Sequence, residues 1–185
     1  MTVTTLFHGA RLMIATTILG LALSAAPVNA AYMACPGANL VQSAARSFAA
    51  ASRTRNPAEF AAAVSRYSDV GSLALFALGP YRSSLPPDLK GAYVAKVRAF
   101  MGHFLADHAR VFANATLQIE SCIDGRIRSA AGGRGIVWKI SGSRIRDVQV
   151  EGIWLVDELR SKFVSVLNRG HGDIGVLFNF LDRNG

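Results

Sequence analysis

The fold class is decided by residues 146–163, RDVQVEGIWLVDELRSKF, because the hydrophobic period changes within them. Side chains up to Glu151 alternate as in a β-strand, whereas those after Gly152 recur at the three- and four-residue spacing of an amphipathic helix. We interpret the stretch as a strand that passes through one glycine directly into a helix. Gly152 permits the sharp turn because it has no Cβ. Arg160 lies beside the apolar face of this helix.

The segments before this junction also alternate with period 2, which predicts an antiparallel sheet of about four strands. In residues 116–123 Cys122 would lie on the solvent face, and the core-facing side chains would be Leu117, Ile119 and Ile123. The Asp-Gly dipeptide at 124–125 is a strong two-residue hairpin turn. Since Ile145 and Val148 cannot share a face in a regular strand, we expect a bulge between them.

Capping signals divide the preceding chain into helices. An alanine-rich helix spans about residues 40–53. Asn56 caps the next helix, with Pro57 at its first position. Asp69 caps a short helix that is apolar on all sides, so we expect that helix to be buried.

A long amphipathic helix follows, from the prolines at 86–87 to about Asn114. Beyond the sheet, the junction helix stops at Gly170 and a last helix begins near Asp173. The predicted fold class is therefore α+β, with N-terminal helices wrapped against a curved antiparallel sheet of about four strands and with C-terminal helices.

The first 30 residues differ from the rest of the chain. Arg11 is their only formal charge, residues 12–26 are mostly apolar, and small residues occupy positions 28 and 30. This order predicts a secretory signal, residues 1–30, cleaved after Ala30, and a single mature domain, residues 31–185. The alternative is a membrane anchor, which needs about 20 apolar residues.

The chain is basic, with 20 Lys and Arg against 12 Asp and Glu, and loss of the signal removes one arginine. An exported basic protein meets anionic lipid head groups and acidic partner surfaces, so we expect no nucleic-acid partner. Cys35 and Cys122 are a candidate disulfide in an oxidising compartment. The alternative is two free thiols, because sequence does not give the Cα distance that a disulfide requires.

No catalytic or metal-binding motif occurs. His103 and His108 are five residues apart, which does not place two metal ligands on one helix face, so we expect no metal and no cofactor. A cone-shaped fold could use Asp69, Asp147 and His108 in acid–base catalysis, although Asp147 could equally accept hydrogen bonds from backbone donors at the bulge. We expect a protein that is not an enzyme.

Two predicted strands carry paired arginines, Arg126 with Arg128 and Arg144 with Arg146. Residues two apart on a strand project from the same face. If the two strands were neighbours, the pairs would form a cationic docking surface for acidic partners or anionic head groups. The alternative is an ordinary solvated face.

Two longer stretches carry a family resemblance. In residues 68–105, SDVGSLALFALGPYRSSLPPDLKGAYVAKVRAFMGHFL, an aspartate begins a short apolar helix that ends in Leu-Gly, and a proline turn leads to a long helix with aromatic residues. Residues 145–181, IRDVQVEGIWLVDELRSKFVSVLNRGHGDIGVLFNFL, hold a closing strand, a Glu-Gly junction and a helix with an arginine and a phenylalanine three residues on. Both resemble the MlaC family, the periplasmic phospholipid-binding, toluene-tolerance auxiliary components of ABC lipid transporters.

The resemblance implies a fold that encloses an apolar cavity for phospholipid acyl chains. It implies a monomeric periplasmic carrier that takes part in outer-membrane lipid asymmetry, with an inner-membrane ABC lipid transporter complex and an outer-membrane lipoprotein complex as partners. The expected lipid-binding residues are Tyr67, Leu75, Leu78, Tyr93, Val97, Phe100, Met101, Phe104, Trp138, Val150, Ile153, Leu155, Leu159, Arg160 and Phe163.

Within this set, Arg160 would pair with an acidic residue such as Asp157 or meet a lipid phosphate, and Trp154 would stand at the cavity rim. Alternatives remain at this point. The cargo could be another lipid such as a hopanoid, the protein could be a small exported enzyme on a cone-shaped α+β fold, or it could be an interaction module that uses its arginine face.

Overall fold

The computed structural model describes residues 35–113 and 117–185, and residues 1–30 with their predicted export signal lie outside this description. The helices are α2 (Ala38–Thr54), α3 (Pro57–Tyr67), α4 (Val70–Ala77), α5 (Lys90–Asp107), α6 (Leu155–Arg169) and α7 (Ile174–Asn184). Short 3-10 helices are η1 (Gly79–Ser84), η2 (Pro87–Leu89) and η3 (Ala109–Val111). The strands are β1 (Gln118–Ile123), β2 (Arg126–Ala131), β3 (Arg134–Ser141), β4 (Arg144–Val150) and β5 (Ile153–Trp154).

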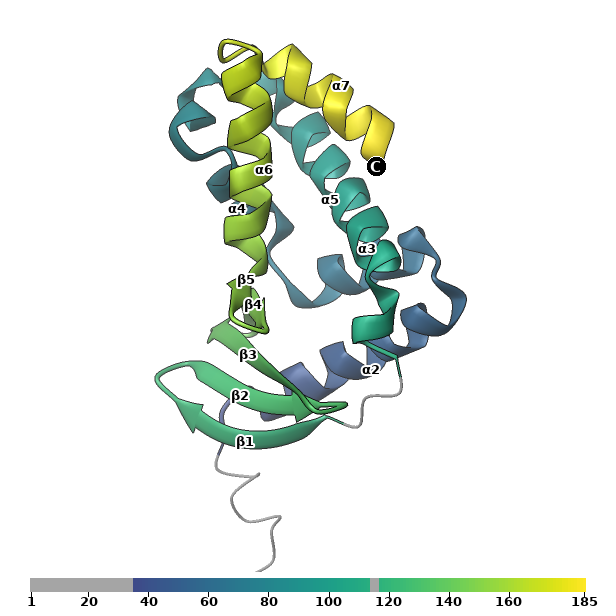
Figure 1. Cartoon of the computed structure of the whole chain (residues 1–185). Coiled ribbons are helices and arrows are strands. Elements are labelled where there is room, and N and C mark those ends of the chain that lie inside the picture. The colour runs from purple at the N-terminus through teal and green to yellow at the C-terminus, as the bar shows by residue number, and fades with distance from the viewer. Residues whose placement is uncertain (1–34, 114–116) are drawn as a thin grey trace, which may run out of the picture.

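The five strands form one antiparallel sheet in the order β1-β2-β3-β4-β5, so each strand pairs with the next one along the chain. The predicted turn joins β1 to β2, and both of its residues have positive φ, 50° for Asp124 and 71° for Gly125. This conformation matches the twist of a two-stranded hairpin. The sheet lies at one end of the molecule and α5, α6 and α7 at the other (Figure 1). The α+β class predicted from the sequence is confirmed.

The first strand is not the regular strand that the sequence predicts. The pairing register shifts between Ile119 and Ser121, and beyond the shift Cys122 pairs with the buried Ile127. Ile123 is 66% exposed. The expectation that Ile123 faces the core and Cys122 faces solvent is wrong, because a bulge moves every later side chain to the opposite face.

The bulge predicted in β4 is confirmed. Lys139 of β3 pairs with Asp147, while the next residue, Ile140, pairs with Ile145. Arg146 is therefore the extra residue on β4. The bulge allows both Ile145 and Val148 to contact the core despite their odd spacing.

The junction after β4 differs from its sequence interpretation. The chain does not pass through one glycine into a helix. Glu151 and Gly152 form a turn with φ of 52° and 88°, and β5 then pairs with β4 before α6 begins. The prediction of about four strands thus omits a strand of two residues, which is too short to show alternation.

The helix starts agree with the predicted caps. Asn56 Oδ1 accepts a hydrogen bond from Ala58 N at 2.9 Å. The last helix begins next to Asp173 as predicted, and Asp173 also caps it by accepting from Gly175 N, which the sequence analysis did not state. The long helix α5 ends at Asp107 rather than near Asn114. The chain there tightens into the single turn of η3, and Phe112 after it packs against the core, next to Phe48 and Phe60.

The short helix α4 is less buried than its composition predicts. Its Val70 and Leu73 are in the core, but Phe76 is 46% exposed. The Arg160 guanidinium carbon lies 5.0 Å from the centroid of the Phe76 ring. A cation above an aromatic face is favourable at the surface, and this contact covers the part of α4 that the core does not.

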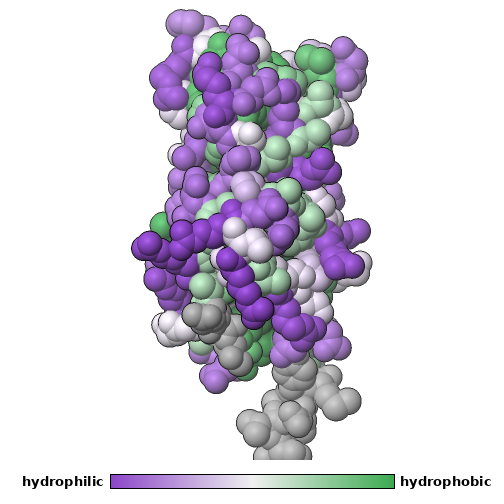
Figure 2. Space-filling view, turned by 90° about the vertical axis from the view of Figure 1, so that its right-hand side faces the viewer, coloured by the Kyte–Doolittle hydropathy of each residue, from purple (hydrophilic) through white to green (hydrophobic). Residues whose placement is uncertain are grey.

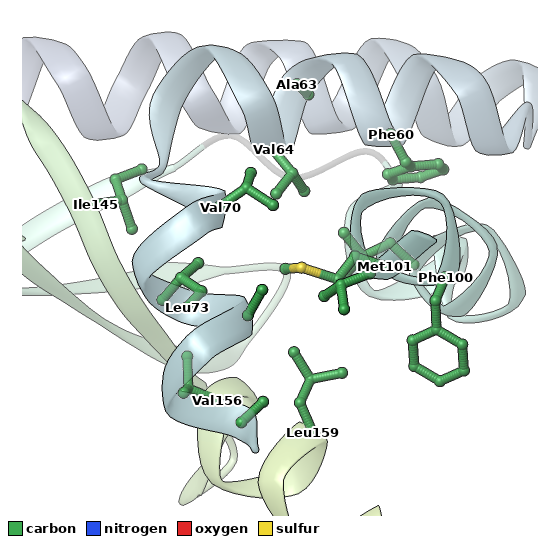
Figure 3. Close-up of a cluster of buried hydrophobic side chains, with 14 of the residues drawn as sticks. Phe60, Ala63, Val64, Val70, Leu73, Phe100, Met101, Ile145, Val156 and Leu159 are labelled. Atoms are coloured by element: carbon green, nitrogen blue, oxygen red, sulfur yellow. The ribbon is translucent and has the colours of Figure 1, made fainter. Parts of the chain in front are cut away.

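One hydrophobic core joins the helices to the inner face of the sheet. Figure 3 shows the meeting point, where α3, α4, α5, β4 and α6 contribute side chains that include Val64, Leu73, Met101, Ile145 and Leu159. Close packing of α3 on α5 depends on Gly102. A Cβ there would come within 2.4 Å of the Pro57 carbonyl oxygen.

A disulfide joins Cys35 to Cys122, as the sequence analysis favoured. Their Cα atoms are 5.7 Å apart, and 87 residues separate them in the chain. Cys35 lies just before α2, and Cys122 lies in β1. The bridge therefore fastens the start of α2 to the edge strand of the sheet.

The two arginine pairs do not combine into one patch. β3 lies between β2 and β4, so Arg126 and Arg128 are not neighbours of the other pair. Arg144 Nη1 instead donates to the Arg66 carbonyl oxygen at the end of α3, at 2.7 Å. Arg146 Nη1 lies 3.1 Å from Asp69 Oδ2. The condition for a shared cationic surface, that the two strands are neighbours, is not met. The arginines of β4 instead contact the α3–α4 junction.

Asp69 is expected to stabilise this junction by about 1 kcal/mol through its cap on α4. Its Oδ1 accepts from Ser72 N and its Oδ2 from the Ser72 hydroxyl. These bonds, with a smaller contribution from Arg146, lower the pKa of Asp69. Its contribution is therefore complete above the usual aspartate pKa and is lost as the pH falls through the lowered folded-state pKa. Denaturant unfolding of Asp69→Ala against wild type should show a deficit at neutral pH that shrinks in acid, and a pH-independent deficit contradicts this account.

Candidate functional site

A pocket of about 490 Å³ lies between the inner face of the sheet and the ends of α3, α5 and α6. We call it the apolar pocket because most of its walls are hydrocarbon. The apolar lining comprises Phe48, Val64, Leu73, Met101, Phe104, Leu105, Val111, Phe112, Trp138, Ile145, Val148, Val150, Ile153, Leu155 and Val156.

The sheet side of the apolar pocket is rigidly held. Trp138 is almost fully buried, and its indole Nε1 donates to the Ser129 hydroxyl at 2.8 Å. Ser129 is itself fully buried and donates toward the Ile136 carbonyl oxygen. A buried indole N–H needs such a partner, so this pair fixes the ring orientation at the pocket wall.

The mouth of the apolar pocket combines exposed hydrocarbon with charge. Ile153 is 63% exposed at the short strand β5, and Phe104 and Leu155 are half-buried. Five charged or titratable side chains complete the lining, His108, Asp147, Glu151, Glu158 and Lys162, and of these His108, Glu151 and Glu158 are exposed. An apolar interior with a polar, partly open rim is the usual form of a site for an amphiphilic ligand.

Six of the predicted lipid-binding residues line the apolar pocket: Met101, Phe104, Trp138, Val150, Ile153 and Leu155. The others lie elsewhere: Tyr67, Leu75, Leu78, Tyr93, Val97, Phe100, Leu159, Arg160 and Phe163. Most of this second group are packed core. Tyr93, for example, is fully buried, donates from its hydroxyl to the Ala74 carbonyl oxygen at 2.8 Å, and has its pKa raised by burial. A direct lipid contact for any of these residues stays a prediction.

Several pocket residues were not singled out from the sequence. Phe48 and Val64 come from helices whose apolar stripes indicate only that they are buried. Ile145 and Val148 lie on either side of the β4 bulge, and both line the pocket. The bulge predicted from their odd spacing could have indicated that both side chains face the interior. Val156 follows directly from the helical stripe of α6.

Arg160 does not pair with Asp157 in this structure, and its contact with a lipid phosphate stays a prediction. It is exposed on α6, lies outside the lining of the apolar pocket, and makes no ion pair with Asp157 or any other described residue. Its contact with Phe76 and its closeness to Gly79 give it a packing role between α6 and the end of α4. Trp154, expected at the rim, is half-buried at the start of α6 and is not part of the lining.

Asp147 serves as a cap for α6 from a neighbouring strand. The residue at the N-cap position of α6, Trp154, has no side-chain acceptor. Asp147 Oδ1 accepts from Val156 N at 3.1 Å and from Val148 N at 2.8 Å. The sequence expectation that Asp147 satisfies backbone donors at the bulge is confirmed. The other catalytic candidates do not join it, since no hydrogen bond connects Asp147 to His108 or Asp69 in the described part of the chain.

The Asp147 carboxyl should make the stability of the fold depend on pH. Burial raises the pKa of Asp147, although its two backbone donors act in the opposite direction. Because the folded-state pKa is above the unfolded value, stability falls as the pH rises from the usual aspartate range through the raised pKa. An asparagine keeps the accepting oxygen without the charge.

We therefore expect the free energy of unfolding of Asp147→Asn to lie within about 1 kcal/mol of wild type at neutral pH. Asp147→Ala should lose about 1–3 kcal/mol, because two partly buried N–H donors lose their acceptor. Urea unfolding curves of the three proteins check this order. Equal losses in both variants would show that the accepting oxygen is not what matters.

The described residues contain no group of three or more His, Cys, Asp or Glu side chains placed to hold a metal ion. Over the same residues, no helix has the length and hydrophobicity needed to cross a membrane.

Comparison with known proteins agrees with this geometry. The solved structure of a phospholipid-binding protein from Ralstonia solanacearum, in complex with a phospholipid, superimposes with a TM-score of 0.63 at 18% sequence identity and covers 79% of this chain and 94% of that chain. No curated protein sequence matches the chain. The family model of the MlaC protein matches residues 38–183, which include every helix and strand described above except the last residue of α7. The chain belongs to the MlaC family.

Proposed function

We propose that this protein is a periplasmic carrier that holds the acyl chains of a phospholipid in the apolar pocket and shuttles the lipid between membrane transport complexes. The observation that carries the proposal is the apolar pocket itself, open at a rim and set in a member of the MlaC family. The phospholipid complex of the Ralstonia solanacearum protein, which shares the fold, supports the same ligand class.

The physical need for such a pocket follows from the hydrophobic effect. Each methylene group exposed to water costs about 0.8 kcal/mol, so two acyl chains of ordinary length cost roughly 20 kcal/mol or more. A lipid without a carrier therefore crosses an aqueous compartment very rarely. The carrier must cover the hydrocarbon and must also release it, and the open rim at Ile153 and Phe104 provides a route for release.

The partners implied by the family are an inner-membrane ABC lipid transporter complex and an outer-membrane lipoprotein complex. Most of the visible surface in Figure 2 is hydrophilic, with only small hydrophobic areas showing, as expected for a molecule that moves through water between them. Binding without catalysis suffices for this role. Of the three residues that an enzyme on this fold could use, Asp69 accepts hydrogen bonds from Ser72 N and from Arg146, and Asp147 accepts from Val148 N and Val156 N. The third, His108, has its Nδ1 2.7 Å from the Phe104 carbonyl oxygen.

A transfer assay tests the proposal. Donor vesicles carrying a fluorescent phospholipid and unlabelled acceptor vesicles are mixed with the purified mature protein. We expect the rate of lipid transfer to rise in proportion to protein concentration, because each molecule carries its cargo separately. A transfer rate equal to that of protein-free vesicles would overturn the carrier role, and conversion of the lipid to a new species would favour an enzyme.

A further inference from the structure

A second hollow of about 500 Å³ lies beside the apolar pocket, between α5, α6 and α7. Phe104, His108, Glu158 and Lys162 line both hollows and so form the boundary between them. The second hollow is much more polar than the first, and we call it the polar groove. Its further polar residues are Asp107, Ser161, Ser165, Arg169 and Asn184.

The charges of the polar groove are ordered along α6. Glu158, Lys162 and Arg169 are four and seven residues apart, a spacing that places them on one helix face. Asp107, at the end of α5, faces them across the groove. The groove thus carries two acidic and two basic side chains. This balance differs from the whole chain, in which 20 basic residues outnumber 12 acidic ones.

Most of these charges have no partner within the part of the chain that the structure describes. Asp107, Glu158 and Lys162 form no ion pair with a described residue, and Arg169 donates only to the Ser165 hydroxyl, at 2.7 Å. The Lys162 ammonium lies 5.9 Å from the centroid of the Phe104 ring, at the boundary with the apolar pocket. The groove therefore offers charges to a ligand whose tails begin at that boundary.

We propose that the polar groove is the head-group compartment of this carrier and that it selects a zwitterionic aminophospholipid. The proposal rests on the proposed lipid-carrier function. Lys162 and Arg169 bind the phosphate, because lysine and arginine are the usual phosphate ligands of proteins. Asp107 and Glu158 bind the ammonium group. A purely anionic head group would pair with Lys162 and Arg169. It would offer no cation to Asp107 and Glu158, and its negative charge would repel both carboxylates.

The test is a competition between two head groups with identical acyl chains. Purified mature protein is exchanged against vesicles of equimolar phosphatidylethanolamine and phosphatidylglycerol, re-isolated, and extracted for mass spectrometry. We expect wild type to retain phosphatidylethanolamine over phosphatidylglycerol by on the order of fivefold, a ratio that two exposed charge pairs can supply. Asp107→Lys/Glu158→Lys should reverse the preference.

Two further variants make the result specific. Asp107→Asn/Glu158→Gln adds no new charge and should bring the ratio close to one. Asp88→Lys/Glu120→Lys changes the net charge by the same amount at exposed sites outside both hollows, and it should keep the wild-type ratio. An equal ratio in all four proteins, with lipid still bound, overturns the head-group assignment and leaves lipid carriage intact. Absence of lipid from the wild type overturns both.

Discussion

Replacing Cys122 with alanine is expected to lower the free energy of unfolding by about 4 kcal/mol, because the disulfide closes a loop of 87 residues and so restricts the unfolded chain strongly. The bridge is also the link that fastens the start of α2 to β1, where Cys35 is buried in the core and Cys122 packs against it. Urea unfolding of the oxidised protein and the variant measures the difference. A loss of this size is a large part of the stability of an ordinary domain.

The single and double variants separate the bridge from the side chains. Cys35→Ala should lose as much as Cys122→Ala, and Cys35→Ala/Cys122→Ala should lose little more than either, since each change removes the same bond. Reducing agent should destabilise wild type and leave the double variant unchanged. Additive losses in the double variant, or no response of wild type to reduction, would mean that the bridge does not stabilise the fold.

The second large effect is expected from filling the apolar pocket. Val148 is half-buried on β4 and lines the apolar pocket. An indole at this position would therefore fill part of the pocket volume that we propose the acyl chains occupy. We expect Val148→Trp to reduce bound lipid about tenfold or more while the protein remains folded, because a void accepts volume that packed core does not. Lipid phosphate per protein chain, measured after exchange with vesicles, gives the occupancy.

Val97→Trp is the matched control. Val97 is fully buried on α5 and lies outside the lining of the apolar pocket, so the same substitution must displace packed neighbours. We expect it to destabilise the protein by about 1–3 kcal/mol, as overpacking does, with no specific effect on lipid binding in the folded fraction. If Val148→Trp destabilised the protein as much as Val97→Trp and kept its lipid, the hollow at Val148 would not be the binding site.

The elements that the sequence predicted well are those set by local chemistry. The caps Asn56 and Asp69 each supply an acceptor two or three residues before a backbone donor, which is a short-range property. The hairpin at 124–125 requires positive φ at both positions, which Asp-Gly tolerates. The β4 bulge follows from an odd spacing between two apolar residues. None of these depends on distant parts of the chain.

The features that sequence alone did not predict depend on tertiary contacts. The bulge in β1 rotates Cys122 toward the core, where the disulfide to Cys35 requires it, and no local pattern in β1 announces that requirement. Phe76 lies outside the core on an apolar helix, and Arg160, more than 80 residues later in the chain, covers part of its ring.

Only part of the candidate site could be predicted from the sequence, because the rest of it also depends on tertiary contacts. Periodicity identifies which side chains are buried, but it does not separate the wall of a void from packed core. Met101 and Val97 lie on the same stripe of α5, yet only Met101 lines the apolar pocket. The difference depends on how α5 is placed relative to the sheet, which lines the pocket through Trp138, Ile145 and Val148, and hydrophobic period does not report that placement.

The central claim is that the apolar pocket holds the tails of a lipid. Native mass spectrometry of the intact protein, purified without detergent, tests it most directly. The account predicts a mass above that of the mature polypeptide by that of bound phospholipid, with the excess lost in Val148→Trp and kept in Asp88→Lys/Glu120→Lys. A wild-type mass equal to the bare polypeptide, both as purified and after incubation with phospholipid vesicles, would contradict it.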